Sequence, residues 1–377
     1  MKLARFMLEE WLEGHRDPSI RFYLGGSTGP IWTVRELLEL DGAGSLEQLL
    51  DADVVYAPSF GSESLRQAIA QMQSVPDEYV LVFTGAAEAL AHIVATVAEP
   101  GANVVVPFPC FPPHQWLPDG LGLEVRLYRL RRENGFRIDA DEIVDLIDAR
   151  TRVVLVNSPH NPTGSTISEP DLRRLHDVAA QRGIQFVSDE VYHPIYHGQQ
   201  TPSAAMLPAA TVVGDLSKAF SLSGLRIGWM VEPDARRRAV YENAREYLTI
   251  SNSPISEYLA EIAVRHREEI FARTREVASA NLQLLEKVFD EHAELLSWVR
   301  PQGGMIAFPW LISGEETRSL CEAAAHEGVL MVPGDCFGLP DHLRIGFGVG
   351  REWYAEAMQR LSALLSRWSV RAASPTA

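Results

Sequence analysis

The sequence predicts an α/β protein with a large domain, built on a mostly parallel seven-stranded sheet covered by helices, and a smaller α/β domain. In the middle of the chain, short runs rich in β-branched and aromatic residues alternate with amphipathic helical patterns, which is typical of parallel sheets with helical crossovers. Several of these runs are almost continuously apolar, as expected for strands that helices cover on both faces. The 377 residues are enough to bury such a core.

The seven expected strands of the large sheet lie between residues 79 and 231. They are Tyr79–Phe83, Asn103–Pro107, Glu124–Tyr128, Arg152–Asn157, Ile184–Ser188, Ala210–Gly214 and Ile227–Val231. The helical patterns that precede or separate them are Ser62–Gln73, Ala86–Glu99, Asp139–Asp148 and Glu169–Arg182. After Pro233 the pattern stays helical to about residue 290, which is long enough to connect two domains.

A second, smaller α/β layer is expected from Leu296 onward. Its strand patterns are Met305–Pro309, Val329–Val332 and His342–Gly346, and its helical patterns are Glu315–Glu327 and Arg351–Arg367. We therefore predict four segments. They are residues 1–40, which contribute to the small domain, the large domain 41–275, the small domain 276–370 and a disordered tail 371–377.

Composition and charge narrow the class of protein. With 46% hydrophobic and 22% charged residues the chain resembles ordinary soluble globular proteins, and its formal charge of −16 argues against nucleic acids and anionic membranes as partners. The N-terminus shows no signal-peptide pattern, and no apolar run is long enough to span a bilayer. Cys110, Cys321 and Cys336 are far apart and include no C-x-x-C pair, so we expect a reduced, cytoplasmic protein.

Lysine is rare in this chain, which contains only Lys2, Lys218 and Lys287. Arginine replaces lysine readily where only surface charge matters, but it cannot replace a lysine whose chemistry needs a primary amine. Lys2 lies at a terminus and Lys287 fits the solvated face of a helix, whereas Lys218 lies in a serine-rich segment after a strand. From rarity alone, Lys218 could equally well be an ordinary surface lysine. The motifs around it decide between the two interpretations.

Functional side chains follow three successive strands of the expected sheet. One strand leads to Asn157 and Asn161, the next ends at Asp189 with Tyr192 beyond it, and the third leads to Ser217-Lys218. Because the carboxyl ends of parallel strands share one edge, these side chains are expected to converge where ligands bind in open α/β sheets. Pyridoxal phosphate needs this set: a lysine amine for the aldimine, a carboxylate for the pyridine nitrogen and neutral donors for the phenolic oxygen.

Three motifs resemble the fold-type I, class I/II aminotransferase family, which depends on pyridoxal 5′-phosphate. They are Asn157-x-Pro-x-Asn161-Pro-Thr-Gly164, Asp189-Glu-Val-Tyr192 and Ser217-Lys218-x7-Arg226-x-Gly228. Their order, spacing and strand context all agree with the family. The resemblance implies that the large domain binds the cofactor and that Lys218 is the catalytic residue.

The resemblance extends toward both ends of the chain. The segment that begins at Tyr56 resembles one whose tyrosine reaches the phosphate of the neighbouring subunit, which implies a homodimer. Thr84-Gly85-Ala86-Ala87 resembles the family's phosphate turn, although alone it reads as a plain strand–helix connection. Phe111 falls where the family stacks a ring on the pyridine, although a lone phenylalanine is more often part of the core.

The segment from His342 to Phe347 resembles the strand whose arginine, here Arg344, binds the substrate carboxylate through a bidentate fork. Alone, a strand arginine is usually solvated or ion-paired. The substrate-binding residues that the resemblance implies are Gly26, Asn161 and Arg344. The cofactor-binding residues that it implies are Tyr56, Gly85, Ala86, Ala87, Phe111, Asn161, Asp189, Tyr192, Ser217, Lys218 and Arg226.

Asp215 departs from the family pattern, which usually has serine or threonine beside the phosphate at this position. Because a carboxylate repels phosphate, we expect Asp215 to turn away, or Ser217 and Arg226 to take over its task. His193 and His197 have the spacing of a metal-binding pair, but Pro194 breaks the helix that would align them. We therefore expect no metal.

The core motifs do not separate transamination from elimination, replacement or racemisation, since the pocket selects which bond at Cα breaks. Segments near Glu9, Glu36 and Ser251 resemble the branch that contains capreomycidine synthase, which cyclises a hydroxylated arginine. We expect an aminotransferase that acts on an L-amino acid and a keto acid through a Lys218 aldimine. The alternative is an elimination or cyclisation enzyme for an arginine-like amino acid, which an acidic pocket would favour; the sequence does not place such a pocket.

A regulator that uses this fold only to bind an effector is not favoured. The chain has no room for a helix-turn-helix module before Tyr56 and no basic face, and it keeps the lysine that such a scaffold would lose.

Overall fold

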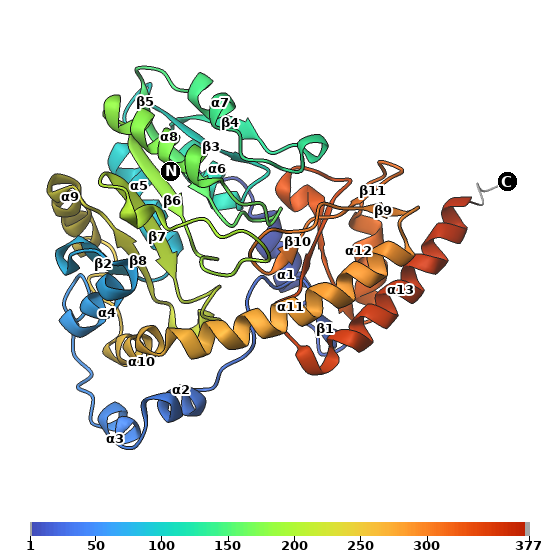
Figure 1. The fold of residues 1–377 in the computed structure, drawn as a ribbon, viewed down its shortest axis with the longest axis horizontal. Helices are drawn as coiled ribbons and strands as arrows, with labels where there is room; N and C mark the ends of the chain where they lie inside the picture. Colours follow the sequence, from blue (N-terminus) through green and yellow to red (C-terminus); the bar gives the residue numbers. More distant parts are fainter. Residues whose placement is uncertain (1, 374–377) are drawn as a thin grey trace.

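The computed structural model describes residues 2–373 and confirms the predicted α/β fold, with a seven-stranded sheet flanked by helices and a smaller α/β unit beside it (Figure 1). The order of strands in the large sheet is β2-β8-β7-β6-β5-β3-β4. These strands are β2 (Val80–Phe83), β3 (Asn103–Phe108), β4 (Glu124–Arg129), β5 (Thr151–Asn157), β6 (Gln185–Asp189), β7 (Ala210–Asp215) and β8 (Gly228–Val231). Each expected strand is present, with its ends shifted by no more than one residue.

Strand direction places the ends of the three functional strands together. β5 pairs with β6, and β6 with β7, in parallel, and the register brings Asn157 opposite Asp189. β8 runs antiparallel to both of its neighbours, β7 and β2, so the sheet is mostly and not wholly parallel. The carboxyl ends of β5, β6 and β7 therefore form one edge, as the motif argument requires.

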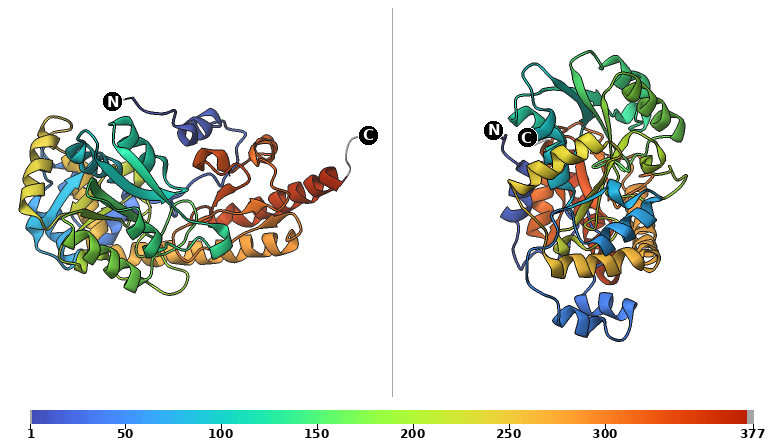
Figure 2. Two further views of the ribbon diagram at one scale, coloured as in Figure 1. Left: turned by 90° about the horizontal axis from the view of Figure 1, so that it is seen from above. Right: turned by 90° about the vertical axis from the view of Figure 1, so that its left-hand side faces the viewer.

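The helices lie on both sides of the large sheet and along the small unit (Figure 2). Their bounds are α1 (Met7–Gly14), α2 (Val34–Asp41), α3 (Ser45–Leu50), α4 (Glu63–Gln73), α5 (Ala86–Val97), α6 (Pro112–Gly120), α7 (Ala140–Asp145), α8 (Glu169–Gln181), α9 (Ala235–Glu246), α10 (Pro254–Arg265), α11 (Arg267–Glu291), α12 (Arg318–His326) and α13 (Arg351–Ala373). No helix among residues 2–373 is long and apolar enough to cross a membrane.

Two helical expectations need correction. Helix α6 is not among the expected helices. It begins with Pro112-Pro113, and proline is well tolerated in the first turn, where no intrahelical donor is needed. The long helical pattern after Pro233 is divided into three helices. Between α9 and α10 the chain leaves the helix, with Ile250 at a φ of 63°, and Pro254 then starts α10.

The small unit contains short strand pairs around β14 (Leu343–Gly346), which lies between β10 (Ile306–Ala307) and β13 (Val332–Pro333). Its other strands are β1 (Phe22–Tyr23), β9 (Leu296–Ser297), β11 (Trp310–Leu311) and β12 (Val329–Leu330). The expected strand at 329–332 is in fact two strands, β12 and β13, which pair with different partners.

The N-terminal segment contacts both parts of the molecule. β1 pairs with β12 in parallel, whereas α2 packs against α10, so residues 1–40 do not all lie on the small unit. The boundaries at residues 40, 275 and 370 stay predictions, and the one at 275 falls inside helix α11. Helix α13 extends to Ala373, so residues 371–373 of the predicted tail are helical, and the disorder of the tail stays a prediction. Residues 374–377 lie outside the described part of the chain.

Candidate active site

A cavity of about 240 Å³ lies at the carboxyl edge of β5, β6 and β7. Nine of the predicted site residues line it: Ala86, Ala87, Phe111, Asn161, Asp189, Tyr192, Ser217, Lys218 and Arg226. Six further residues complete the wall: Glu9, Leu90, Asn157, Val191, Asp215 and Ser223. Motifs separated by more than a hundred residues thus meet at the sheet edge where ligands bind in this class of fold.

Lys218 projects into the cavity just after β7. Its Nζ donates a hydrogen bond to Ser27 Oγ at 2.9 Å and has no ion-pair partner among the described residues. Burial lowers the pKa of Lys218, and although the charge of Asp215 opposes this shift, burial outweighs it. A lower pKa makes the neutral amine, which is the nucleophilic and basic form, easier to reach near neutral pH.

Asp189 is a buried carboxylate at the end of β6. Its Oδ2 lies 2.8 Å from His114 Nε2, and its Oδ1 accepts a hydrogen bond from the backbone N–H of Val191. A carboxylate removed from water needs cationic or hydrogen-bonding partners, and this one faces the cavity. Sequence reasoning missed His114 because the helix that carries it, α6, was not expected.

The loop after β5 is tied to the end of β6. Asn157 Nδ2 donates to the backbone carbonyl of Asp189 at 3.0 Å, and Asn157 Oδ1 accepts from the backbone N–H of Asn161 at 2.8 Å. These bonds place the Asn161 side chain at the cavity wall and hold it close to Arg344, a residue of β14.

Arg344 is a nearly fully buried cation next to the cavity, with 2% of its surface exposed. Its Nη1 donates to Asn161 Oδ1 at 3.3 Å and its Nη2 to the carbonyl of Gly25 at 2.7 Å, but its Nε has no partner. No carboxylate pairs with this guanidinium among the described residues. Since an unpaired buried charge is costly, the geometry favours an anionic ligand here. The residue after Gly25, Gly26, packs against Gly346 of β14. A Cβ at position 346 would lie 2.0 Å from the carbonyl oxygen of Gly26, so no side chain fits there.

Arg226 lies beside the start of α5. Arg226 Nη2 donates to the carbonyl of Thr84 at 3.4 Å, and Nη1 approaches Ser217 Oγ at 3.5 Å, again without a carboxylate partner in the described chain. Gly85 has a φ of 81°, and a Cβ there would lie 2.4 Å from Arg226 Nη2. The free backbone N–H groups and positive end of a 12-residue helix, together with a guanidinium, suit a phosphate.

Tyr192 Oη is buried without a hydrogen-bond partner, and burial raises the pKa of Tyr192 to about 12. The phenol is therefore a neutral donor that awaits an acceptor in the cavity. The ring of Phe111, in the same wall, meets His114 edge to face with 5.7 Å between ring centroids. Both rings line the same cavity, and the resemblance implies that they contact a pyridine ring and its phenolic oxygen.

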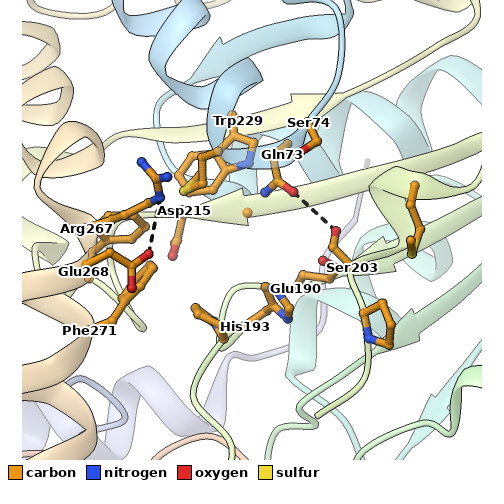
Figure 3. Close-up of a pocket in the computed structure, with 16 residues that line it drawn as sticks. Gln73, Ser74, Glu190, His193, Ser203, Asp215, Trp229, Arg267, Glu268 and Phe271 are labelled. Atoms are coloured by element: carbon orange, nitrogen blue, oxygen red, sulfur yellow. Dashed lines mark hydrogen bonds and ion pairs between the residues drawn. The ribbon is translucent and has the colours of Figure 1, made fainter.

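Asp215 lines both this cavity and a second cavity of about 320 Å³, whose lining side chains are drawn in Figure 3. Its Oδ1 accepts a hydrogen bond from the backbone N–H of Ser217 at 2.9 Å. Burial raises the pKa of Asp215, although the charge of Lys218 opposes this. A raised pKa favours the neutral carboxyl, which would repel a phosphate less than a carboxylate would.

Four of the predicted site residues are not among those that line this cavity: Gly26, Tyr56, Gly85 and Arg344. Tyr56 is 79% exposed and does not reach the cavity of its own chain. His193 Nδ1 lies 3.0 Å from Tyr196 Oη, and His197 Nε2 lies 2.7 Å from the carbonyl of Gly304, so the two imidazoles have different partners. Within residues 2–373, no three histidine, cysteine or acidic side chains are grouped as a metal site would require.

A family model described as "Aminotransferase class I and II" matches residues 48–361. The chain belongs to this family. Its cofactor is pyridoxal phosphate, and the residues present fit that group: an unpaired lysine amine, a buried carboxylate, an anion cradle at a helix start and an unpartnered phenol.

Relatives of known name within this aminotransferase family cover most of the chain. Capreomycidine synthase from Streptomyces vinaceus is 34% identical over 91% of this chain and 89% of its own length. Arginine–pyruvate transaminase from Pseudomonas aeruginosa is 30% identical over 84% of each chain. The crystal structure of a PLP-dependent aminotransferase from Streptococcus suis superposes with a TM-score of 0.91 at 29% identity, covering 97% of this chain and 99% of that one. The PLP-dependent cyclase OrfR superposes with a TM-score of 0.89 at 30% identity and 98% coverage of each.

Proposed function

We propose that this chain is an aminotransferase that moves the α-amino group of an L-amino acid to a keto acid. One observation carries the proposal: Lys218 and Arg226 line one cavity, Arg344 bonds to Asn161 of its wall, and none of the three cations has a carboxylate partner in the described chain. An amine flanked by two anion sites suits a cofactor phosphate on one side and an amino-acid carboxylate on the other.

This function assigns a role to each of the predicted site residues near the cavity. Asp189, supported by His114, would hold the cofactor's ring nitrogen, and Arg226, Ser217 and the turn at Gly85–Ala87 would hold its phosphate. Asn161 and Tyr192 would meet the phenolic oxygen, and Phe111 would cover the ring. Arg344, with Asn161 and Gly26 beside it, would bind the substrate carboxylate. When bound, pyridoxal phosphate supplies an electron sink for the charge that develops at the substrate Cα.

Lys218 would move a proton between the substrate Cα and the cofactor C4′ once substrate has freed its amine. Burial lowers the pKa of Lys218, which suits a general base that works near neutral pH. Ser27 Oγ accepts a hydrogen bond from Nζ at 2.9 Å and would help to position the amine for this proton transfer.

Mixing the purified protein with a panel of amino acids in the absence of keto acid tests this function. At least one amino acid is expected to convert the yellow form of the enzyme to the pyridoxamine form with release of its keto acid, because half of the reaction needs no acceptor. Adding a keto acid should restore the yellow form. Absorbance follows both steps, and the proposal fails if no amino acid produces this cycle.

Elimination with cyclisation is the second candidate, since capreomycidine synthase and the cyclase OrfR are both similar over nearly the whole chain. The same panel separates the two reactions when it includes arginine and hydroxylated arginine. A cyclase would release a product lighter by one water from the hydroxylated substrate and would keep the yellow form. Mass spectrometry of the product, together with absorbance, identifies the reaction.

We also propose a homodimer in which Tyr56 completes the partner's site, because Tyr56 and its neighbours Val54 and Val55 are strongly exposed, at 79%, 83% and 67%. Tyr56→Ala and Lys218→Arg subunits are each expected to be inactive or nearly so. In mixed dimers one site would combine native Lys218 with native Tyr56, so refolding the two variants together should restore activity. A fully active monomer in sedimentation, or no restoration, would contradict the shared site. A cytoplasmic location stays a prediction.

A further inference from the structure

Helix α1 contributes a carboxylate without a partner to the wall of the catalytic cavity. Of its three glutamates, Glu10 pairs with Arg5, and Glu13 pairs with Arg16 at 3.3 Å. Glu9 has neither an ion pair nor a hydrogen bond to its side chain within residues 2–373, although it lines the cavity together with Lys218. Because Glu9 is exposed and has no such partner, a ligand that enters the cavity displaces only water from its carboxylate.

The helix that carries Glu9 is firmly placed. Leu8 and Trp11, on either side in its turn, are 2% and 6% exposed. Trp11 Nε1 donates to the carbonyl of Met331 at 2.8 Å, and the guanidinium of Arg318 lies over the Trp11 ring. Phe6, just before the helix, meets the cavity residue Phe111 with 6.3 Å between ring centroids. The position of Glu9 is thus set by the packing of its neighbours, so the carboxylate needs no partner of its own to stay at the cavity.

The charge of Glu9 interacts with two cations of the site, Lys218 and Arg344. Burial lowers the pKa values of Lys218 and Arg344, and the charge of Glu9 opposes both shifts, although neither cation pairs with it. The proposed function puts the substrate carboxylate on Arg344 and its reacting carbon at Lys218. The substrate side chain then has to leave Cα toward the remaining wall of the cavity, and Glu9 belongs to that wall.

The other two acids of the cavity are already engaged on the cofactor side. Asp189 is bound by His114 and the backbone of Val191, and Asp215 accepts from the backbone of Ser217. Glu9 is therefore the one carboxylate among the cavity's described lining residues that makes no hydrogen bond or ion pair.

We propose that Glu9 is a specificity-determining residue that binds the cationic end of the substrate side chain, a guanidinium or an ammonium. The inference rests on the proposed function, because that function defines where the amino acid lies, but it holds for transamination and for cyclisation alike. A planar guanidinium offers paired donors that match a carboxylate. Acidic side chains are excluded by the same charge.

The test uses ligands that bind but cannot react. Desamino-arginine and desamino-citrulline have nearly the same shape and both lack the α-amine, but only the first is charged. Calorimetry with the cofactor-loaded protein is expected to show tighter binding of desamino-arginine by about tenfold to a hundredfold, the range of a charge-assisted hydrogen bond. Glu9→Gln should remove most of this preference, because it keeps the shape of the side chain and removes its charge.

Glu10→Gln is the matched control, since Glu10 is on the same helix and its loss breaks only the ion pair with Arg5. This variant should keep the preference. Equal weakening of both ligands by Glu9→Gln would show a merely structural role and overturn the inference. So would a wild-type protein that binds the neutral ligand as tightly as the charged one.

Turnover of arginine against citrulline distinguishes failure of the inference from failure of the proposed function. If the enzyme transaminates neutral or acidic amino acids better than arginine, the function stands and the role of Glu9 is wrong. If no amino acid reacts but the Glu9-dependent preference for desamino-arginine is present, the cation site stands and the proposed reaction is wrong. Support for both requires a kcat/KM preference for arginine that Glu9→Gln lowers and Glu10→Gln leaves unchanged.

Discussion

Lys218→Arg is expected to lower turnover by at least about 10⁴-fold, the order of loss when an enzyme loses a residue that serves as both nucleophile and base. Arginine keeps the positive charge but stays protonated, so it neither condenses with the aldehyde of the cofactor nor accepts a proton from Cα. The side chain is long enough to keep contact with Ser27, so the fold should be retained. Single-turnover absorbance with the best amino acid of the panel measures the loss.

Lys287→Arg is the matched control, because Lys287 is exposed on helix α11 and lies outside the cavity. This variant should be as active as the wild-type enzyme. Borohydride reduction of the wild-type protein should attach the cofactor to the peptide that contains Lys218 and to no other. Attachment elsewhere, or full activity of Lys218→Arg, would refute the assignment.

Asp189→Asn is expected to lower kcat by about 10²- to 10³-fold, which is the cost of losing one preorganised electrostatic contact in a buried site. Asparagine has the same shape but carries no charge, so it cannot stabilise a positive charge on the ring nitrogen of the cofactor. Without that charge the ring accepts electrons from Cα less well. The measurement is the rate of the first half-reaction at saturating amino acid.

The cofactor content of Asp189→Asn should be measured alongside, since the ring would still be held by the phosphate cradle at Arg226 and Gly85. His114→Asn is expected to cause a smaller loss, because it removes the support of the carboxylate at 2.8 Å but keeps its charge. If His114→Asn is as damaging as Asp189→Asn and both proteins unfold at lower temperature, the pair serves stability and the catalytic role fails.

Much of the site was predictable because its residues follow strands. Asn161, Asp189 and Lys218 each come shortly after an apolar run, and parallel strands place their carboxyl ends at one edge whatever the details of packing. Arg344 was also predictable, but through its motif, since the strand that carries it belongs to another sheet. Its meeting with Asn161 depends on how the two units pack.

The residues that were missed lack such local signals. Ser27 precedes no motif, and its contact with Lys218 joins positions 191 residues apart. His114 lies on a helix that begins with two prolines, so the sequence pattern did not predict this helix. Glu9 is one of two adjacent glutamates, and sequence alone does not tell which of the two lines the cavity and which pairs with Arg5.

The amino-acid sequence by itself predicted the class of fold, because strand periodicity is a local property of the chain. Its motifs, through their resemblance to the aminotransferase family, predicted the cofactor and proposed Lys218 as the residue that binds it. Only the tertiary structure decided which charges stay unpaired. Whether Glu9, Arg226 and Arg344 are neutralised by neighbours or left for a ligand depends on contacts between segments far apart in the chain. Of the three, Arg344 alone is buried, and burial makes its unpaired charge costly. The unpaired charges, which the family resemblance does not reveal, are the basis for the proposed substrate.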